Sequence, residues 1–298
     1  MAITINTNLS SQIVQSNLNK ATTSLNQAIE RMTTGYKINH AADNAAGYSI
    51  ARSWEAKLGS LDVAADNAAT GADMLSTLED HYALVSTHVQ RIRDLTEQAA
   101  NGTYGEQSLK AIQEEINARL DEIDRIALNC EFSGQNLMDG TLENKNIAIQ
   151  VGLDSDGGRS QISLEGKLFK SGKIADLFKD AGFEIDRADI AKFCANLDPE
   201  TDPDDRVDAA DMLVKIDDVI DKISSRVTTL GAAQNRIESA IESIAVQSEN
   251  ITSSLSTLRD ADVAQESSNF LKAQILQQAS ATLLATANQT PSIALNLL

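Results

Sequence analysis

Proline is scarce in this sequence, and the first of its three prolines is Pro199. Because proline breaks helix interiors, its absence from the first 198 residues permits long, uninterrupted helices. Aromatic residues make up only 4% of the chain, although hydrophobic residues make up 42%. The apolar content is therefore mostly Ala, Leu, Ile and Val, which suits thin seams between helices better than a deep globular interior.

Cysteine is scarce too, and the positions of Cys130 and Cys194 exclude its usual structural roles. Two cysteines cannot build a disulfide framework, and neither lies in a CxxC motif or a Cys/His cluster. We therefore expect both to be small, buried or half-buried side chains. A cleavable secretory signal is absent as well, because MAITINTNLSSQ has no basic n-region, no continuous apolar segment and no small-residue cleavage site. The protein is expected to stay inside the cell or to leave it by another route.

Positive charge is in short supply, with 25 Lys and Arg against 43 Asp and Glu and a net charge of -18. Nucleic acid and anionic membranes would be repelled by such a chain. The ends differ from the rest, since Lys20 is the one ionisable side chain in residues 1–29 and residues 273–298 have none. The tail is too rich in Gln, Asn, Ser and Thr to cross a bilayer. Both ends are therefore expected to leave water by packing against protein.

Catalytic and metal-binding signals are missing. The sequence has no GxxxxGK[ST], HExxH or GxSxG motif and no glycine-rich dinucleotide pattern after a strand. His81 and His88 are seven residues apart on one expected helix, too far to share a metal ion easily. The carboxylates of Asp198, Glu200, Asp202 and Asp204 resemble a calcium loop, but Pro203 replaces the required glycine and no Glu follows at position twelve. We expect no enzyme activity, no cofactor and no metal.

Heptad repeats of apolar residues are what the sequence does contain. The first expected helix ends at Gly35, a candidate left-handed cap. Its seam and those of two further expected helices are Val14, Leu18, Ala21, Leu25, Ala28 and Met32; Leu61, Ala65, Ala68, Ala72, Leu75, Leu78, Tyr82, Val85, Val89 and Ile92; and Leu109, Ile112, Ile116, Leu120, Ile123 and Ala127.

The longest seam runs from Leu213 to Leu258 without a break in its alternation of three and four residues. At about 1.5 Å per residue this helix would be roughly 70 Å long. A compact protein of this chain length would be only about 50 Å across. The sequence therefore predicts a mainly α fold, an elongated rod of long antiparallel helices with coiled-coil packing.

The middle of the chain changes character. Residues 145–165 alternate apolar and polar positions on either side of Asp156-Gly157-Gly158, which predicts one β-hairpin. Four of the six phenylalanines follow between Phe169 and Phe193, and they indicate a small inserted lobe with its own core. An acidic linker with two prolines occupies 197–205.

The hexapeptide AADNAA occurs twice, at 41–46 and at 64–69. The first copy follows an irregular stretch, so Asp43 or Asn44 is expected to cap the next helix. The second copy lies inside a heptad run and places Ala65 and Ala68 in the seam. The repeat is therefore one alanine-rich composition used for two purposes.

The tail carries a stripe, Leu276, Ala279, Leu283 and Ala287, that is expected to pair with the N-terminal seam of Val14, Leu18 and Leu25. Such a pair would still leave uncharged outer faces in water. More copies of the same chain could cover them. A heterologous contact of this kind that does not close builds a helical filament.

The residues of both ends resemble one family. MAITINTNLSSQIVQSNLNKATTSLNQAIERMTTGYKINHAADNAAGYSIA is similar to the N-terminal segment of bacterial flagellin. SSRVTTLGAAQNRIESAI and SSLSTLRDADVAQESSNFLKAQILQQASATLLATANQTPSIALNLL are similar to its C-terminal segment. The resemblance covers roughly 1–165 and 206–298. It leaves 166–205 unmatched, and Cys130 stands where a polar residue would be expected, so an exposed thiol there would allow filaments to crosslink.

The resemblance implies a structural subunit that self-assembles into the hollow, helical flagellar filament used for motility. It implies an inner-tube domain from 1–40 and 259–298, a rod domain from 41–165 and 206–258, and a short variable lobe and linker at 166–205. A hook-filament junction protein or another flagellin-like coiled-coil interaction protein is the alternative. A protease in the lobe, as in some flagellins, is not expected because the lobe has no metalloprotease motif and no histidine.

The resemblance also implies partners and a site. These are further copies of the chain, an export chaperone at the C-terminal helix, filament cap and hook-junction proteins, export through the flagellar type III apparatus, and an extracellular location. It further implies recognition by Toll-like receptor 5 of a vertebrate host. The matching residues are Gln90, Arg91, Leu95 and Glu115, and the same surface is expected to pack between subunits. The simpler alternative is that Arg91 and Glu115 form an interhelical salt bridge worth about 0 to 1 kcal/mol.

Overall fold

The computed structural model describes residues 8–153, 157–185, 187–195 and 209–295, with side chains through residue 289 of the last segment. The chain forms two units, one of residues 1–59 with 248–298 and one of residues 60–247. This grouping places 41–59 and 248–258 with the terminal helices, whereas the sequence analysis assigned them to the rod.

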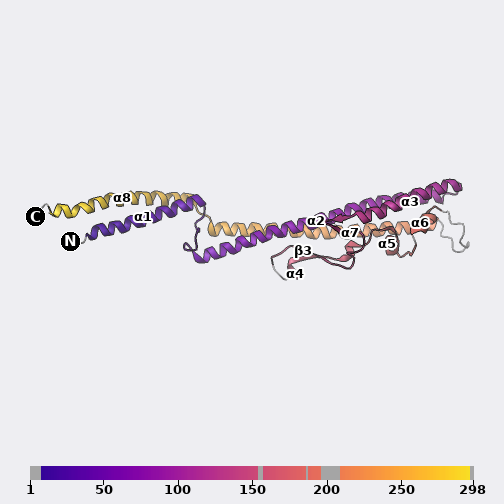
Figure 1. Ribbon diagram of the computed structural model, residues 1–298, viewed down its shortest axis with the longest axis horizontal. Helices are drawn as coiled ribbons and strands as arrows, with labels where there is room; N and C mark the ends of the chain where they lie inside the picture. The colour runs from indigo at the N-terminus through magenta and orange to yellow at the C-terminus, as the bar shows by residue number, and fades with distance from the viewer. Residues whose placement is uncertain (1–7, 154–156, 186, 196–208, 296–298) are drawn as a thin grey trace. The chain divides into compact units, whose positions relative to one another are not determined.

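The terminal unit is built on two helices, α1 (Leu9–Thr34) and α8 (Val263–Leu295), which run side by side (Figure 1). Asn8 caps α1 by accepting a hydrogen bond from the backbone N–H of Ser11 at 3.1 Å. Gly35 ends the helix at φ 76° and donates its N–H to the carbonyl of Arg31. This left-handed geometry favours glycine and confirms the predicted cap.

Two long helices pass through both units, α2 (Ala45–Ala100) and α7 (Ala209–Arg259). The predicted uninterrupted helix over 213–258 is confirmed. Ser60–Ala100 of α2 and the part of α7 up to Gln247 belong to the second unit, together with α3 (Glu106–Asn129). Figure 1 shows these three helices packed along one another.

The helices of the second unit are antiparallel neighbours. His88 and Arg91 of α2 contact Arg119 and Glu115 of α3, so residue numbers rise on one helix as they fall on the other. The same order holds for α2 and α7, where Glu79 contacts Gln234 and Arg93 contacts Asp217. Their predicted seams are the core, and the buried members are Leu61, Ala68, Leu75, Leu78, Tyr82, Val85, Val89, Ile92, Ile112, Ile116, Leu120, Ile123, Ala127, Ile216, Ile223, Leu230, Ile237 and Ile244.

The predicted β-hairpin is present as β3 (Ile147–Gln150) paired antiparallel with β4 (Gln161–Leu164), with Ile149 opposite Ile162. The helix α4 (Gly157–Ser160) directly precedes β4, and Asp156 of the predicted turn lies outside the described residues. The hairpin packs on α2 at Gly71, where a Cβ would come within 2.3 Å of the Ile149 side chain. A larger residue at Gly71 would require the tip of the Ile149 side chain to move.

A second strand pair, β1 (Glu131–Phe132) with β2 (Gln135–Asn136), was not predicted. Its turn has two consecutive residues with positive φ, Ser133 at 50° and Gly134 at 81°. Tight hairpin turns use this geometry, and Gly usually takes one of the two positions. The Ser-Gly dipeptide was the signal available in the sequence.

The inserted segment does not have its own core, which corrects the sequence analysis. It contains a 3₁₀ turn, η1 (Gly166–Phe169), and the helices α5 (Ile174–Asp180) and α6 (Arg187–Cys194), both in contact with α3. Phe169 and Phe178 are buried in one cluster with the seams of α2, α3 and α7. A segment this short cannot enclose enough apolar surface alone. The linker at 197–205 and its four carboxylates lie outside the described residues.

Phe178→Ala should destabilise the whole second unit by about 3 to 5 kcal/mol, because it opens a cavity in the shared core. Urea unfolding followed by far-ultraviolet circular dichroism checks the magnitude, and hydrogen exchange checks its extent. The control Val214→Ala alters a side chain that is 63% exposed and should change the free energy of unfolding by less than about 0.5 kcal/mol. Loss of exchange protection confined to 166–195 would instead indicate a separate core.

Candidate functional site

The α1–α8 pair is held in register by polar contacts as well as by apolar packing. Gln277 donates to Thr22 at 3.2 Å, and Arg31 pairs with the buried carboxylate of Glu266 at 3.3 Å. At the other end of α1, the side chains of Asn8 and Ser11 donate to the carbonyl of Ala287 and to the side chain of Asn288, each at 2.7 Å. These contacts fix two antiparallel helices over the full length of α1.

The seam between α1 and α8 differs from the predicted one on the α8 side. On α1, Ala21 and Ala28 are buried, and Val14, Leu18 and Leu25 are half-buried as expected. On α8 the buried residues facing α1 are Glu266, Ala273 and Ser280, spaced by seven, and Ala287 is half-buried in the same row.

Leu276 and Leu283 are 49% and 56% exposed, so they do not form the seam inside one chain. Ala279 is exposed as well. The physical reason is close approach, since small side chains on the facing rows allow two helices to meet where leucine would hold them apart. Leu276, Ala279 and Leu283 instead line one side of a groove of about 680 Å³ whose floor includes Ala21 and Ala28.

Free apolar side chains remain on both helices of the pair. They are Leu9, Ile13, Ile29 and Met32 on α1, and Val263, Leu271, Ile275, Leu276 and Leu283 on α8, each more than one third exposed. Residues 273–298 carry no charged side chain that would keep this surface in water. From residue 273 onward, the surface can therefore bind protein without desolvating a charged side chain of its own.

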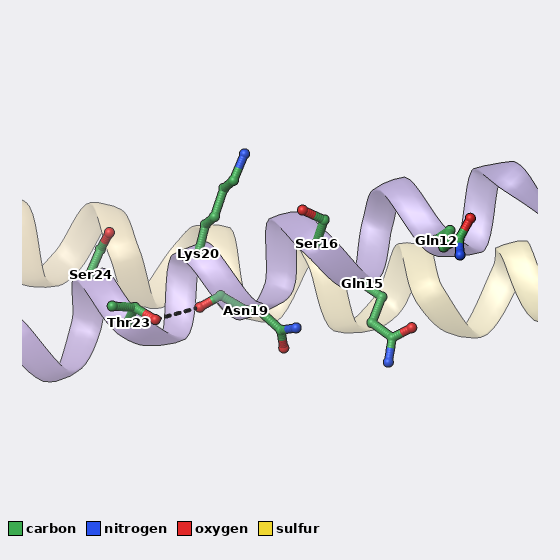
Figure 2. Close-up of a pocket in the computed structure, with 7 residues that line it drawn as sticks. All are labelled: Gln12, Gln15, Ser16, Asn19, Lys20, Thr23 and Ser24. Carbon is green, nitrogen blue, oxygen red and sulfur yellow. Dashed lines mark hydrogen bonds between the residues drawn. The ribbon is translucent and has the colours of Figure 1, made fainter.

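A second, polar hollow of about 710 Å³ runs along α1 (Figure 2). All seven of its lining side chains come from α1, and Lys20 is the one charged member; the others are Gln12, Gln15, Ser16, Asn19, Thr23 and Ser24. The Thr23 hydroxyl donates to the carbonyl of Asn19, and the amide and serine side chains supply the other uncharged donors and acceptors. This face can form neutral hydrogen bonds with a neighbouring protein.

The connector between α1 and α2, residues 35–44, contains the residue that caps α2. The Asn44 side chain accepts the N–H of Gly47 at 2.9 Å and is the N-cap. Asp43 turns back and accepts the N–H groups of His40 and Asn39 at 3.0 and 3.1 Å. The hydrogen bond from the backbone of His40 lowers the pKa of Asp43. The two candidates therefore have separate roles.

The connector is also tied to the segment between α7 and α8. Lys37 donates its N–H to the carbonyl of Arg259 at 2.7 Å, and Ala261 donates to Gly35 at 2.8 Å. The Arg259 guanidinium lies 4.1 Å from the centre of the Tyr36 ring and pairs with Glu55. These contacts join both connecting segments of the terminal unit.

The surface formed by α2 and α3 brings together three of its four predicted residues. Arg91 binds Glu115 through Nε and Nη2 at 3.2 and 3.1 Å, and Gln90 is exposed beside them. The predicted salt bridge is therefore present, with the Arg91 side chain 47% exposed. Leu95 is only 2% exposed and belongs to the core, so it lies beneath this surface.

Neither the cysteines nor the helical histidines form a reactive site. Burial raises the pKa of Cys130 to about 12 and that of Cys194 to about 11. His81 lies 2.7 Å from the carbonyl of Thr77, and His88 lies 3.4 Å from Arg119. Among the described residues, no group of His, Cys, Asp and Glu is arranged to hold a metal ion.

Comparison with known families identifies the terminal segments. The bacterial flagellin N-terminal helical region matches residues 5–143, and the bacterial flagellin C-terminal helical region matches residues 213–298. The chain belongs to the bacterial flagellin family. Flagellin is a structural component of the flagellar filament and is not an enzyme, so the function inferred from the resemblance is confirmed. The two matches leave 144–212 unassigned, the part that holds the hairpin and the inserted segment.

Individual relatives agree over the full chain. The flagellin of Bacillus subtilis (strain 168) is 36% identical over 314 residues, covering 99% of both chains. Flagellin B of Vibrio cholerae is 30% identical over 377 residues and covers 100% of both. Across the helices that the structure describes, none is both long and apolar enough to span a bilayer.

A solved structure shares the fold. It is a protein of Vibrio parahaemolyticus described as flagellar hook-associated, with a TM-score of 0.61 over 73% of this chain and 100% of that one. Its sequence is only 15% identical, so it supports the helical architecture alone. The full-length identity to flagellins favours the filament subunit over the junction-protein alternative.

Cys130 and Cys194 should resist iodoacetamide at pH 8 in the native protein, because burial shields both thiols and keeps them protonated. Both should react in denaturant, and mass spectrometry of the intact chain counts the adducts. Rapid modification of the folded protein would show that one thiol is accessible.

The same thiols make stability depend on alkaline pH. An unfolded thiol loses its proton near pKa 9, whereas the folded ones keep theirs to higher pH, so the free energy of unfolding should fall as pH rises above about 9. The loss should be on the order of 2 to 3 kcal/mol for each thiol by pH 11. The Cys130→Ala Cys194→Ala double variant should show a clearly smaller fall in denaturant titrations.

Proposed function

We propose that the α1–α8 pair is the surface through which copies of this flagellin pack into a hollow, helical filament used for motility. The observation that carries the proposal is the set of exposed apolar side chains on two helices that have few charged residues, with none from residue 273 onward. Leu276 and Leu283 are central, since they flank the groove beside Ala21 and Ala28 without entering the seam of their own chain.

Packing energetics favours this surface over the rest of the molecule. Fully burying one leucine side chain contributes about 1.5 to 3 kcal/mol. Leu276 and Leu283 are each about half exposed in the single chain, so about half of this stabilisation is still to be gained when a neighbouring copy covers them. Every acidic residue of the chain lies between Glu30 and Glu266, so the tail approaches its neighbour without like-charge repulsion. A contact between different faces of identical chains repeats without closing and produces a helical polymer.

The same surface explains the partners inferred from the family resemblance. Before assembly, the exposed leucines and isoleucines of α8 need cover, and an export chaperone at the C-terminal helix would supply it. Export through the flagellar type III apparatus, which uses no cleaved signal, would deliver the chain to the extracellular flagellum. Hook-junction proteins at the base and cap proteins at the tip would meet the two ends of the polymer.

We further propose that Gln90, Arg91 and Glu115 are the receptor-contacting part of the α2–α3 surface recognised by Toll-like receptor 5. Their exposure supports direct contact, and the Arg91–Glu115 pair holds the guanidinium in place. Leu95 supports this surface from the core. In a filament, the same face would pack between subunits.

Leu276→Ser with Leu283→Ser should abolish filament formation and leave a folded, soluble monomer, because both side chains are exposed in the single chain. Sedimentation and electron microscopy measure assembly, and circular dichroism measures the fold. Gln278→Ser, at an exposed polar position of α8, is the matched control and should assemble normally. Long filaments from the double variant would rule out this packing surface.

Arg91→Ala should weaken activation of a Toll-like receptor 5 reporter by purified monomer about tenfold, because it removes a charged, exposed contact. Arg125→Ala is the control, since Arg125 is exposed and pairs with Glu122 on its own helix. The half-maximal concentration of the reporter response is the measurement. Equal responses to the Arg91 variant and the unmodified protein would contradict the assignment.

A further inference from the structure

The second unit contains a groove lined mainly by basic side chains, although the protein as a whole is acidic. A cavity of about 460 Å³ lies between β4, η1 and α7. Five of its lining residues are basic, Lys167, Lys170, Lys222, Arg226 and Arg236, and two are acidic, Glu165 and Asp180. The lining is therefore net positive in a chain of net charge -18.

The groove is built from the core outward. Arg226 donates to the hydroxyl of Tyr82 at 3.1 Å, to the carbonyl of Ser171 at 2.8 Å, and to Asp180 at 3.0 Å. Lys170 pairs with the other oxygen of Asp180. Burial alone would raise the pKa of Asp180, but the hydrogen bonds from Lys170 and Arg226 outweigh burial and lower it. Asp180 therefore stays ionised and is neutralised by two cations.

Three cations of the groove remain available. Lys167, Lys222 and Arg236 have no ion pair among the described side chains, and all three are exposed. Lys222 and Arg236 are on α7, fourteen residues and thus about 21 Å apart. Small side chains between them, Ser225, Thr229, Ala232 and Ala233, leave the hollow open. The groove therefore suits an extended acidic surface.

The chain itself carries such a surface on α2. Residues 58–90 contain five acidic residues and no Lys or Arg. Asp66, Asp73 and Asp80 are spaced by seven, with Asp62 four residues before them, so these four share one helix face over about 27 Å. All four are exposed, and within the described part of the chain none of them forms an ion pair. We call this face the acidic stripe.

We infer that the acidic stripe of one copy docks into the basic groove of a neighbouring copy. The two surfaces are opposite in charge and similar in length, and each runs along one long helix, α7 for the groove and α2 for the stripe. They are different faces of one chain, so the contact is heterologous and continues from copy to copy. The inference rests on the proposed self-assembly. It adds an interface between the basic groove and the acidic stripe, distinct from the α1–α8 surface and from the Arg91–Glu115 face, that would orient neighbouring copies.

Charge reversal tests the match. Lys222→Glu with Arg236→Glu, or Asp73→Lys with Asp80→Lys, should each raise the critical concentration for assembly at least about tenfold, because attraction becomes repulsion. The chain with all four substitutions should assemble again, since its groove and stripe are complementary once more. Lys57→Glu with Lys145→Glu, at exposed positions outside both surfaces, is the control of equal charge change.

The outcomes separate the two proposals. If either reversed pair assembles like the unmodified protein, or if the fourfold variant fails to recover while its circular dichroism is unchanged, the docking is overturned. Carbodiimide crosslinking of filaments mixed from ¹⁴N and ¹⁵N chains gives a second measurement without substitutions. Hybrid peptides joining Lys222 or Lys167 to the acidic stripe are expected, and crosslinks only within one chain would contradict the inference. Failure of the Leu276 and Leu283 test would overturn the terminal surface alone.

Discussion

Close packing along narrow apolar seams is the constraint on which the rest of this structure depends. Each long helix has one thin stripe of Ala, Leu, Ile or Val, so it is stable only when a partner lies along that stripe. In the second unit α2, α3 and α7 supply partners to one another, and the inserted segment closes the remaining side. In the terminal unit α1 and α8 pack on one another, and apolar side chains of both described helices remain uncovered. The part of the chain with too few internal partners is thus the part that needs other molecules.

The seams of the second unit could be predicted from sequence because charged residues separate their buried and exposed faces. On α8 that contrast is lost, since uncharged polar and apolar residues alternate all round the helix, and the sequence alone could not choose between Leu276 and Ala273 for the seam. The size of the side chains at the contact decided in favour of Ala273 and Ser280. Helix phase is therefore hardest to predict where function depends on an uncharged surface.

Other differences come from information that position in the sequence does not contain. The match to a family motif located Leu95 in the sequence but did not show whether its side chain is exposed. In the fold, Leu95 of α2 is buried in the core. The phenylalanines of the inserted segment were close in sequence, yet Phe169 and Phe178 pack on distant helices. Asp43 and Asn44 are both good caps, and only the path of the connector decides that Asn44 serves α2. In each case tertiary contacts selected among locally acceptable choices.

The two buried cysteines have a practical consequence for chemistry on this protein. With both thiols enclosed and held in the protonated form, the native surface described by the structure offers no competing thiol. A single cysteine placed on an exposed helix position would therefore carry a fluorophore, a spin label or a gold particle at one defined point of every copy. The native thiols would not need to be removed first, so the packing around Cys130 and Cys194 could stay as it is.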